Sequence, residues 1–209
     1  DLLRSKSGDR NSYNSGDWFN RLDWTYGGNN WGVGLPPNSQ DRAMVLAPLL
    51  ADSALEPTQS DILAASAAFR ELLQIRRSSP LFRLRTAEEV KATVAFANTG
   101  PEQIPGLIVM KLVDKAGVDS IYDRIVVLFN ANQAAVTYRA PELRGVPLKL
   151  HPAQLSSADV VLRTATFDPD AADFVIPGRT TAVFVVTDDE AATLPTPAVA
   201  LATAPPIPS

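Results

Sequence analysis

Cysteine is absent from the sequence, and histidine occurs once, as His151. The lack of cysteine excludes disulfide bonds, zinc sites made of thiolates and thiol nucleophiles. It does not assign a compartment, because many exported bacterial proteins also lack cysteine. His151 stands beside Pro152, without cysteine, histidine or carboxylate neighbours at the spacing of metal ligands. We therefore expect a structural role for His151, and neither a metal ion nor a cofactor in this chain.

Long apolar runs and basic clusters are also missing. No stretch approaches the roughly 20 apolar residues of a membrane-spanning helix, and no signal peptide opens the chain. The net charge is weakly acidic, −4, and lysine and arginine do not recur along one face. A nucleic-acid-binding protein would carry such a basic footprint. We therefore expect neither nucleic acid nor a membrane as a partner. A hydrophobic content of 45% indicates an ordinary globular chain.

Residues 1–58 are rich in glycine and proline, which break any extended periodicity. Only short helical turns are expected there, such as one within residues 41–50 that Pro48 keeps short. A longer helix of about 17 residues is expected between Ser60, as its N-cap, and Pro80, which ends it. Apolar residues spaced three and four apart form one stripe along it: Ile62, Ala65, Phe69, Leu72 and Leu73.

From about residue 90 the pattern changes to short runs rich in Val, Ile, Phe and Thr, separated by turn residues. Strands are expected at residues 93–96, 107–113, 125–129, 135–138, 160–167, 174–176 and 181–186. Many short strands without a long helix between them favour an antiparallel sandwich. The end of the chain is rich in Ala, Pro and Thr, which is typical of a disordered linker or terminus.

The run from Arg4 to Trp24 carries charged, amide, hydroxyl and aromatic side chains with neither helical nor strand periodicity. These groups suit a sugar. Carboxylates and amides exchange hydrogen bonds with hydroxyls, arginine offers a rigid fork of donors, and flat rings cover the apolar face of a pyranose. A solvated polar loop without a ligand is the alternative.

The segment from Leu2 to Pro37 reads LLRSKSGDRNSYNSGDWFNRLDWTYGGNNWGVGLPP. It resembles the segment just after the eighth barrel strand of pullulanases and plant limit dextrinases, debranching members of the α-amylase superfamily. Further landmarks similar to that family follow in order: SSPLFRL at 78–84, NTGP at 98–101, PGLIVM at 105–110 and IPGRT at 176–180. Together these motifs cover most of residues 1–187, so the resemblance is specific.

The resemblance implies an α+β fragment in three parts. Residues 1–85 would be the end of the catalytic (β/α)8 barrel, namely the loop after strand 8 and the final helix. Residues 86–188 would form a C-terminal antiparallel β-sandwich, and residues 189–209 an Ala/Pro-rich tail or linker. A whole barrel would then precede Asp1, and the apolar stripe of the final helix would lack its natural partner. A secreted bacterial parent is favoured over a plastid or cytoplasmic one.

The resemblance also implies the activity of the parent, which is hydrolysis of α-1,6 branches of pullulan, amylopectin or limit dextrin with retention of configuration. Such chemistry needs two carboxyl groups about 5 to 5.5 Å apart. In the family they lie on earlier barrel strands, so no residue of this chain is expected to be catalytic and the chain alone is expected to be inactive. Asp17 and Asp23 are the nearest substitutes, but carboxylates in a polar loop are more often solvated or ion-paired.

Substrate binding is what the resemblance carries over to this chain. In α-amylase relatives, an Asp followed four residues later by an Arg binds glucose hydroxyls on the non-reducing side of the cleaved bond. Asp17 and Arg21 fit that spacing, and in one helical turn both would face the same way and hold one sugar. A structural Asp–Arg ion pair is the alternative. Trp18 is also expected to contact the sugar, whereas Phe19 and Trp24 are expected to pack the loop.

Four charged residues are expected to form a hydrogen-bond and ion-pair frame for this loop: Arg4, Lys6, Asp9 and Arg10. Two functions of different kinds therefore remain. The first is the C-terminal third of a debranching hydrolase, which binds branched α-glucan together with the barrel. The second is a non-catalytic carbohydrate-binding or scaffolding module. We favour the first, because residues 1–58 make physical sense as the rim of a barrel.

Overall fold

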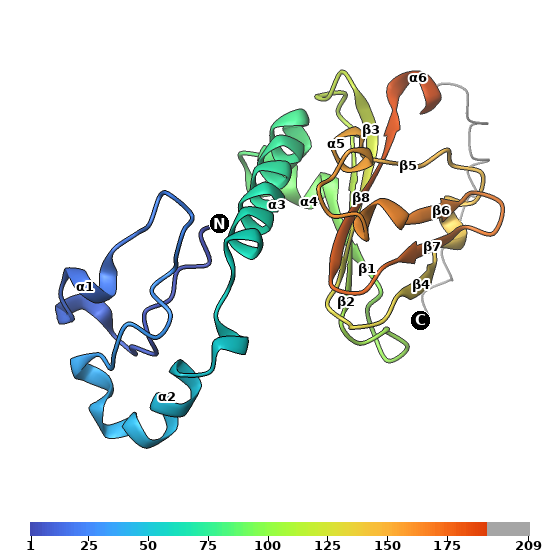
Figure 1. Cartoon of the computed structure of the whole chain (residues 1–209). Helices are drawn as coiled ribbons and strands as arrows, with labels where there is room; N and C mark the ends of the chain where they lie inside the picture. Colours follow the sequence, from blue (N-terminus) through green and yellow to red (C-terminus); the bar gives the residue numbers. More distant parts are fainter. Residues whose placement is uncertain (192–209) are drawn as a thin grey trace, which may run out of the picture. The chain divides into compact units, whose positions relative to one another are not determined.

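The computed structural model describes residues 1–191, and the chain divides into two compact units. The first unit consists of residues 1–83 together with 151–164, and the second of residues 84–150 together with the chain from 165 onward. Figure 1 shows the elements of both units. Of the predicted tail at 189–209, everything after residue 191 lies outside the described residues. Among the described residues, no helix has the length and apolar character needed to cross a membrane.

The first unit is rich in loops and short helical turns. Its helical elements are η1 (Ser12–Asn14), α1 (Asp17–Asn20), η2 (Pro37–Arg42), α2 (Ala43–Leu50), η3 (Ser53–Leu55), α3 (Gln59–Ser78), η4 (Pro80–Arg83), α5 (Pro152–Leu155) and η6 (Leu162–Thr164). The short helix predicted within residues 41–50 is confirmed as α2, which contains Pro48. The long predicted helix is confirmed as α3, and Pro80 follows its C-cap residue.

The N-terminus of α3 differs from the prediction. Thr58, rather than Ser60, is the N-cap: its Oγ1 accepts from the backbone N–H of Asp61, and the Asp61 carboxylate accepts from the backbone N–H of Thr58. This capping box satisfies two free amides reciprocally, whereas a serine at position 60 could satisfy only one. The hydrogen bond from the Thr58 side chain lowers the pKa of the Asp61 carboxyl. The helix therefore begins earlier than expected, at Gln59.

One face of α3 is covered by the segment around α5. Burial along the helix is confined to Ile62, Ser66 and Ile75. Near its C-terminal end, His151 Nδ1 accepts from the Ala153 backbone N–H, so the other ring nitrogen, Nε2, carries the hydrogen and donates to Ser78 Oγ at 3.0 Å. These contacts confirm that the only histidine is structural.

The predicted apolar stripe is only partly buried. Ile62 is 1% exposed, but Phe69, Leu72 and Leu73 are 48%, 45% and 48% exposed. Among residues 1–191, this side of α3 is therefore left about half exposed.

The second unit consists of two antiparallel sheets. The larger has the strand order β1–β2–β3–β8–β5 and the smaller β4–β7–β6. The strands are β1 (Val94–Ala97), β2 (Leu107–Val113), β3 (Tyr122–Asn130), β4 (Val136–Arg139), β5 (Lys149–Leu150), β6 (Thr166–Asp168), β7 (Asp173–Ile176) and β8 (Thr180–Thr187). Short helical elements accompany them: α4 (Ala87–Thr93), η5 (Pro141–Leu143) and α6 (Asp188–Ala191). Antiparallel pairing in both sheets confirms the predicted antiparallel strands, whereas helix α4 shows that the region is not all-β as predicted.

Aromatic rings join the two sheets. Phe174 on β7 is fully buried, and its ring lies edge-on to that of Phe184 on β8, with 5.1 Å between centroids. Within the smaller sheet the Phe174 ring also meets Phe167 at 4.4 Å and Tyr138 at 6.5 Å. Aromatic pairs in such geometries add to the stabilisation from burial alone. The core of the second unit therefore lies between the sheets, as in a sandwich.

Two local predictions in the β region were wrong. Residues 160–167 do not form one strand, because the Asp159 carboxylate accepts from the backbone N–H groups of Val161 and Leu162 and turns the chain into η6. Only Thr166–Asp168 is extended, as β6. Thr93 ends helix α4 instead of starting a strand, and the capping box between Thr86 and Glu89 that begins this helix was overlooked.

Candidate functional site

The polar loop at the start of the first unit is held by the predicted frame of charged residues. Arg4 Nη1 donates to the carbonyl of Asn20 at 2.8 Å, and Lys6 Nζ donates to Ser12 Oγ at 3.3 Å. The buried Asp9 carboxylate accepts from the backbone N–H of Asn11 at 3.1 Å, and also from the Ser15 hydroxyl. The frame role predicted for these residues is confirmed.

Two buried asparagines, Asn29 and Asn30, close the loop on itself. Asn29 Nδ2 donates to the carbonyl of Leu3 at 2.8 Å, and the backbone N–H of Ser5 donates to the Asn29 carbonyl at 2.7 Å. Asn30 Oδ1 accepts from Arg21 Nε at 3.0 Å, and its Nδ2 donates to the Arg21 carbonyl at 3.1 Å. Amide side chains thus satisfy the backbone where no strand ladder or helix does.

Asp17 and Arg21 lie one helical turn apart, as predicted. Asp17 begins α1, and its carbonyl accepts from the backbone N–H of Arg21 at 2.9 Å. Both side chains are exposed, and within residues 1–191 no ion pair joins them. The Arg21 guanidinium donates through Nε to Asn30, which orients it. The alternative of a structural Asp17–Arg21 ion pair therefore has no support in the described residues.

Trp18 follows Asp17 in sequence, and its indole N–H forms a hydrogen bond with the backbone. Its Nε1 donates to the carbonyl of Val33 at 2.9 Å, yet the residue is 58% exposed. The Arg21 guanidinium carbon lies 5.6 Å from the centroid of the indole ring, within cation–π distance. Asp17, Trp18 and Arg21 thus come together on one exposed turn.

The neighbouring aromatic and acidic residues have other roles. Trp24 is 68% exposed, so the prediction that it packs the loop is wrong, whereas Phe19 is half-buried. Trp24 lies in the tight turn that Asp23 forms with Thr25, whose hydroxyl and backbone N–H both donate to Asp23 Oδ1. The hydrogen bond from the Thr25 side chain lowers the pKa of Asp23. A carboxyl held ionised in this way does not suit a proton donor at neutral pH.

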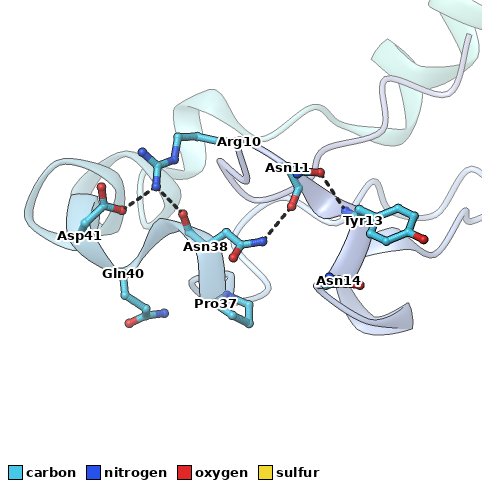
Figure 2. A pocket seen from close by; sticks show the side chains of 8 residues that line it. All are labelled: Arg10, Asn11, Tyr13, Asn14, Pro37, Asn38, Gln40 and Asp41. Carbon is cyan, nitrogen blue, oxygen red and sulfur yellow. Dashed lines mark hydrogen bonds and ion pairs between the residues drawn. The ribbon is translucent and has the colours of Figure 1, made fainter.

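A polar cavity of about 650 Å³ opens beside this loop (Figure 2). Its lining residues are Arg10, Asn11, Tyr13, Asn14, Pro37, Asn38, Gln40 and Asp41. Figure 2 shows Arg10 reaching across to Asp41 Oδ1 at 3.1 Å and to the carbonyl of Asn38 at 2.8 Å. Asn38 Nδ2 in turn donates to the Asn11 carbonyl at 2.9 Å. These contacts link residues 10–14 to residues 37–41.

The structure does not place the predicted trio of Asp17, Trp18 and Arg21 in the lining of this cavity. The predicted polar run included the lining amides of Asn11 and Asn14, but those of Asn38 and Gln40 were not predicted. The available signal was a pair of side-chain amides in each of two short segments, Asn11 with Asn14 and Asn38 with Gln40, which only the fold brings together. Among the described residues, no group of three or more His, Asp or Glu side chains is placed to hold a metal ion.

Comparisons with known proteins agree on one family. The sequence profile of alpha-1,6-glucosidases, pullulanase-type, C-terminal, matches residues 26–187. The chain is 47% identical over 194 residues to Pullulanase 1, chloroplastic, of Arabidopsis thaliana. The aligned residues make up 88% of this chain and 20% of that protein. It is 38% identical over 164 residues to a pullulanase of Klebsiella pneumoniae, covering 76% and 15% respectively.

The fold agrees with the same proteins. The crystal structure of the maltotriose complex of PulA from Klebsiella pneumoniae matches with a TM-score of 0.73 and 33% identity, over 89% of this chain and 20% of that chain. A pullulanase from Paenibacillus barengoltzii, in complex with maltohexaose and alpha-cyclodextrin, matches with a TM-score of 0.52 and 25% identity. The chain spans about a fifth of the length of the Arabidopsis relative.

Proposed function

Because the chain belongs to the pullulanase-type alpha-1,6-glucosidases, whose C-terminal region it matches, we propose that it is the C-terminal part of a debranching hydrolase. The whole enzyme would cleave α-1,6-glucosidic branches of pullulan, amylopectin or limit dextrin with retention of configuration. The described residues would contribute part of the substrate cleft and a β domain, while the barrel supplies the bond-breaking acids.

In this proposal residues 1–85 complete the barrel, as the loop after its last strand and its final helix. The exposed apolar side of α3 supports this assignment. Phe69, Leu72 and Leu73 each expose nearly half of their surface in a helix whose other face is packed. A soluble chain seldom leaves such a stripe to water, because burying each side chain is favourable by about 1.5 to 3 kcal/mol. Residues 86–188 then follow as the C-terminal sandwich, apart from residues 151–164, which pack with the first unit. The tail is proposed at 189–209.

Asp17, Arg21 and Trp18 are proposed to bind glucose units next to the cleaved bond. The observation that carries this assignment is their arrangement on one exposed turn. The Asp17 carboxylate forms no ion pair among residues 1–191, and the Arg21 guanidinium is oriented by Asn30 and lies beside the indole ring of Trp18. The carboxylate would accept from sugar hydroxyls, the guanidinium would donate to them, and the indole face would pack against C–H groups. The PulA relative binds maltotriose, a ligand of this class.

The two carboxyl groups of the retaining mechanism are proposed to lie upstream of this chain. Asp23, the half-buried acid of the loop, is held ionised by its hydrogen bond from Thr25, which does not suit a proton donor at neutral pH. The role of the described residues is therefore to bind and orient the sugar, and bond cleavage needs groups from elsewhere.

Two arms test the proposal. In the first, pullulan hydrolysis is measured for the 209-residue chain and for a longer polypeptide that includes the upstream coding sequence. We expect activity only in the longer polypeptide. Hydrolysis by the 209-residue chain would contradict the absence of catalytic acids. Maltotriose binding by this chain that is as tight as in the longer protein would favour the binding-module alternative.

In the second arm, Asp17→Ala is introduced into the longer polypeptide. The loss of charged hydrogen bonds to sugar is expected to lower kcat/KM by about tenfold or more, corresponding to roughly 1.5 to 3 kcal/mol per bond. Asp170→Ala, an exposed carboxylate in the turn between β6 and β7, is the matched control and should leave kcat/KM unchanged. Equal kinetics of the two variants would reject the binding role.

A further inference from the structure

The second unit contains a cavity of about 310 Å³, at the lower end of the volumes typical of small-molecule sites. Its walls come from the end of α4, from β1, β2 and β3, and from η5. Figure 1 labels α4 and the three strands. The lining residues are Lys91, Ala92, Thr93, Val94, Ala95, Lys111, Val113, Lys115, Arg124, Glu142 and Leu143.

Two of the basic residues, Lys111 and Arg124, project from the core-facing side of the larger sheet. Lys111 pairs with Val126, and Arg124 is two residues from Val126 on the same strand, so all three side chains share one face. Val126 in turn pairs with Phe184, whose ring meets the second sheet. Both basic side chains are only 24% exposed. Cations on the inner face of a sandwich are costly unless they are paired.

Among the described residues, Lys111 has a close carboxylate partner and Arg124 does not. Lys111 Nζ donates to Glu142 Oε1 at 2.9 Å. Burial is the largest single influence on Glu142 and would raise its pKa, but the hydrogen bond and charge of Lys111, together with a backbone hydrogen bond, outweigh it, so the pKa is lowered and the pair is ionic. The nearest carboxylate to Arg124 is that of Asp123, at 3.8 Å. Arg124 Nε is buried and has no hydrogen-bond partner in residues 1–191.

The lining therefore has more positive than negative charge. Lys91, Lys111, Lys115 and Arg124 stand against the single carboxylate of Glu142, in a chain whose overall net charge is −4. The excess is local and is built from one guanidinium and three ammonium groups. A guanidinium fork with neighbouring ammonium groups is the donor set that proteins use for phosphate oxygens.

We infer that this cavity binds a phosphate group, held by the Arg124 guanidinium and by the lysines around it. Inorganic phosphate and a sugar phosphate present the same dianion. The side chains of Ala92, Val94 and Leu143 give the cavity an apolar wall that an organic remainder can contact. This cavity lies in the second unit, whereas the turn proposed to bind sugar belongs to the first, and the inference does not depend on the proposed function.

The test is calorimetric titration of the full 209-residue chain at low ionic strength. Inorganic phosphate and glucose 6-phosphate are the two probes, and glucose is the uncharged control. We expect saturable binding of both phosphates and none of glucose. Tighter binding of glucose 6-phosphate would identify a sugar phosphate as the ligand, and equal affinities would identify the free ion. The absence of saturable phosphate binding would overturn the inference.

Variants make the test specific to the cavity. Arg124→Gln should weaken phosphate binding by about tenfold or more, because it removes a charged donor. If Arg124→Gln fails to fold, the double variant Lys91→Gln/Lys115→Gln decides. It alters two exposed lining residues and should weaken binding several-fold. Glu142→Gln should strengthen binding, because it removes the competing carboxylate.

The matched control is Lys149→Gln. Lys149 pairs with Val185 on β8, next to Phe184 in sequence, so it lies on the opposite face of the same sheet, where it forms an ion pair with Glu190. This change removes one positive charge outside the cavity and should leave phosphate affinity unchanged. The inference would be contradicted if the cavity variants bound phosphate as tightly as this control. Those variants are Lys91→Gln/Lys115→Gln and, if it folds, Arg124→Gln.

Discussion

The two units of this chain are stabilised in different ways. The second unit buries most of the apolar side chains, with Phe174 and Phe184 meeting between its sheets. The first unit buries far fewer; its buried apolar residues are Leu2, Ile62, Ile75, Leu81 and Leu162. What holds its loop is a set of hydrogen bonds from Asn29, Asn30 and charged side chains to the backbone.

The β-sandwich of the second unit and the polar loop of the first are stabilised by different interactions. Burial of apolar surface is the dominant favourable contribution to folding, so the sandwich carries its own driving force. Side-chain to backbone hydrogen bonds contribute only about 0.5 to 1.5 kcal/mol each, since the unfolded loop makes the same bonds with water. The first unit thus makes many polar contacts but buries little apolar surface, which agrees with its proposed role as one part of a larger barrel.

The largest effect is expected at the centre of the sandwich. Phe174→Ala should lower the free energy of unfolding by about 3 to 5 kcal/mol, because it removes a fully buried ring and leaves a cavity. Urea denaturation followed by far-UV circular dichroism measures the change. Val175→Ala, at a neighbouring residue that is 40% exposed, is the control and should cost far less. Similar losses in both variants would show that the core is not where the structure places it.

A smaller and more local effect is expected in the polar loop. Asn30→Ala removes the two hydrogen bonds to Arg21 and should destabilise the loop by about 1 to 3 kcal/mol. Amide hydrogen exchange should accelerate in residues 1–42 while the strands of the second unit keep their protection. Asn14→Ala changes an exposed amide of the same loop and should alter little. Faster exchange throughout the sandwich would show that the two units do not open independently, which would contradict this comparison.

The pH dependence of stability should report on the first unit through His151. Burial lowers the pKa of His151 below its ordinary value of 6.5. The unfolded chain therefore binds this proton more readily, so the contribution of His151 is complete above pH 6.5 and declines as the pH falls below it. Urea midpoints at pH 7.5 and pH 5.5 should show this decline.

His151→Gln is the matched variant, and it should show a smaller difference between the two pH values. The carboxyls with lowered pKa values, such as Asp61 and Glu89, lose their contributions only at more acidic pH. Because the sequence has a single histidine, a pH dependence that is identical in the variant would contradict the structural role assigned here.

The smallest effect concerns association through the exposed side of α3. Leu72→Gln and Leu73→Gln together should reduce self-association of the chain at high concentration, because they remove apolar surface that water does not favour. Sedimentation velocity over a range of concentrations measures the change. Gln74, an exposed polar residue on the same helix, provides the control substitution Gln74→Ala. Unchanged association in the double variant would show that this surface does not mediate self-association.

Local sequence signals predicted much of the fold. Alternating or apolar runs found strands such as β2 and β8, and spacings of three and four found α3. The errors arose where side chains compete for backbone groups. Asp159 turned a strand-like run into a 3₁₀ turn, and the reciprocal bonds of Thr58 and Asp61 moved the start of α3. Such competition depends on conformation, so composition and periodicity do not reveal it.

The candidate sites could be predicted only in part. The family resemblance singled out Asp17 and Arg21, and their spacing correctly predicted that they lie one helical turn apart. Sugar binding by these two residues stays a prediction. The polar cavity in the first unit and the basic cavity in the second join residues that are far apart in sequence, such as Arg10 with Asp41 and Lys111 with Glu142. The packing of His151 near Ser78 likewise joins distant residues. Contacts of this kind arise from topology, which no local pattern encodes.

The most direct test of the central proposal is a double-mutant cycle on Asp17 and Arg21 in the longer polypeptide. The quantity measured is kcat/KM for pullulan in the unchanged enzyme, in Asp17→Ala, in Arg21→Ala and in the double variant. If both side chains hold one sugar, the combined loss will be smaller than the sum of the single losses by about 0.5 to 3 kcal/mol. Strictly additive losses, or no loss in either single variant, would contradict a shared sugar-binding role.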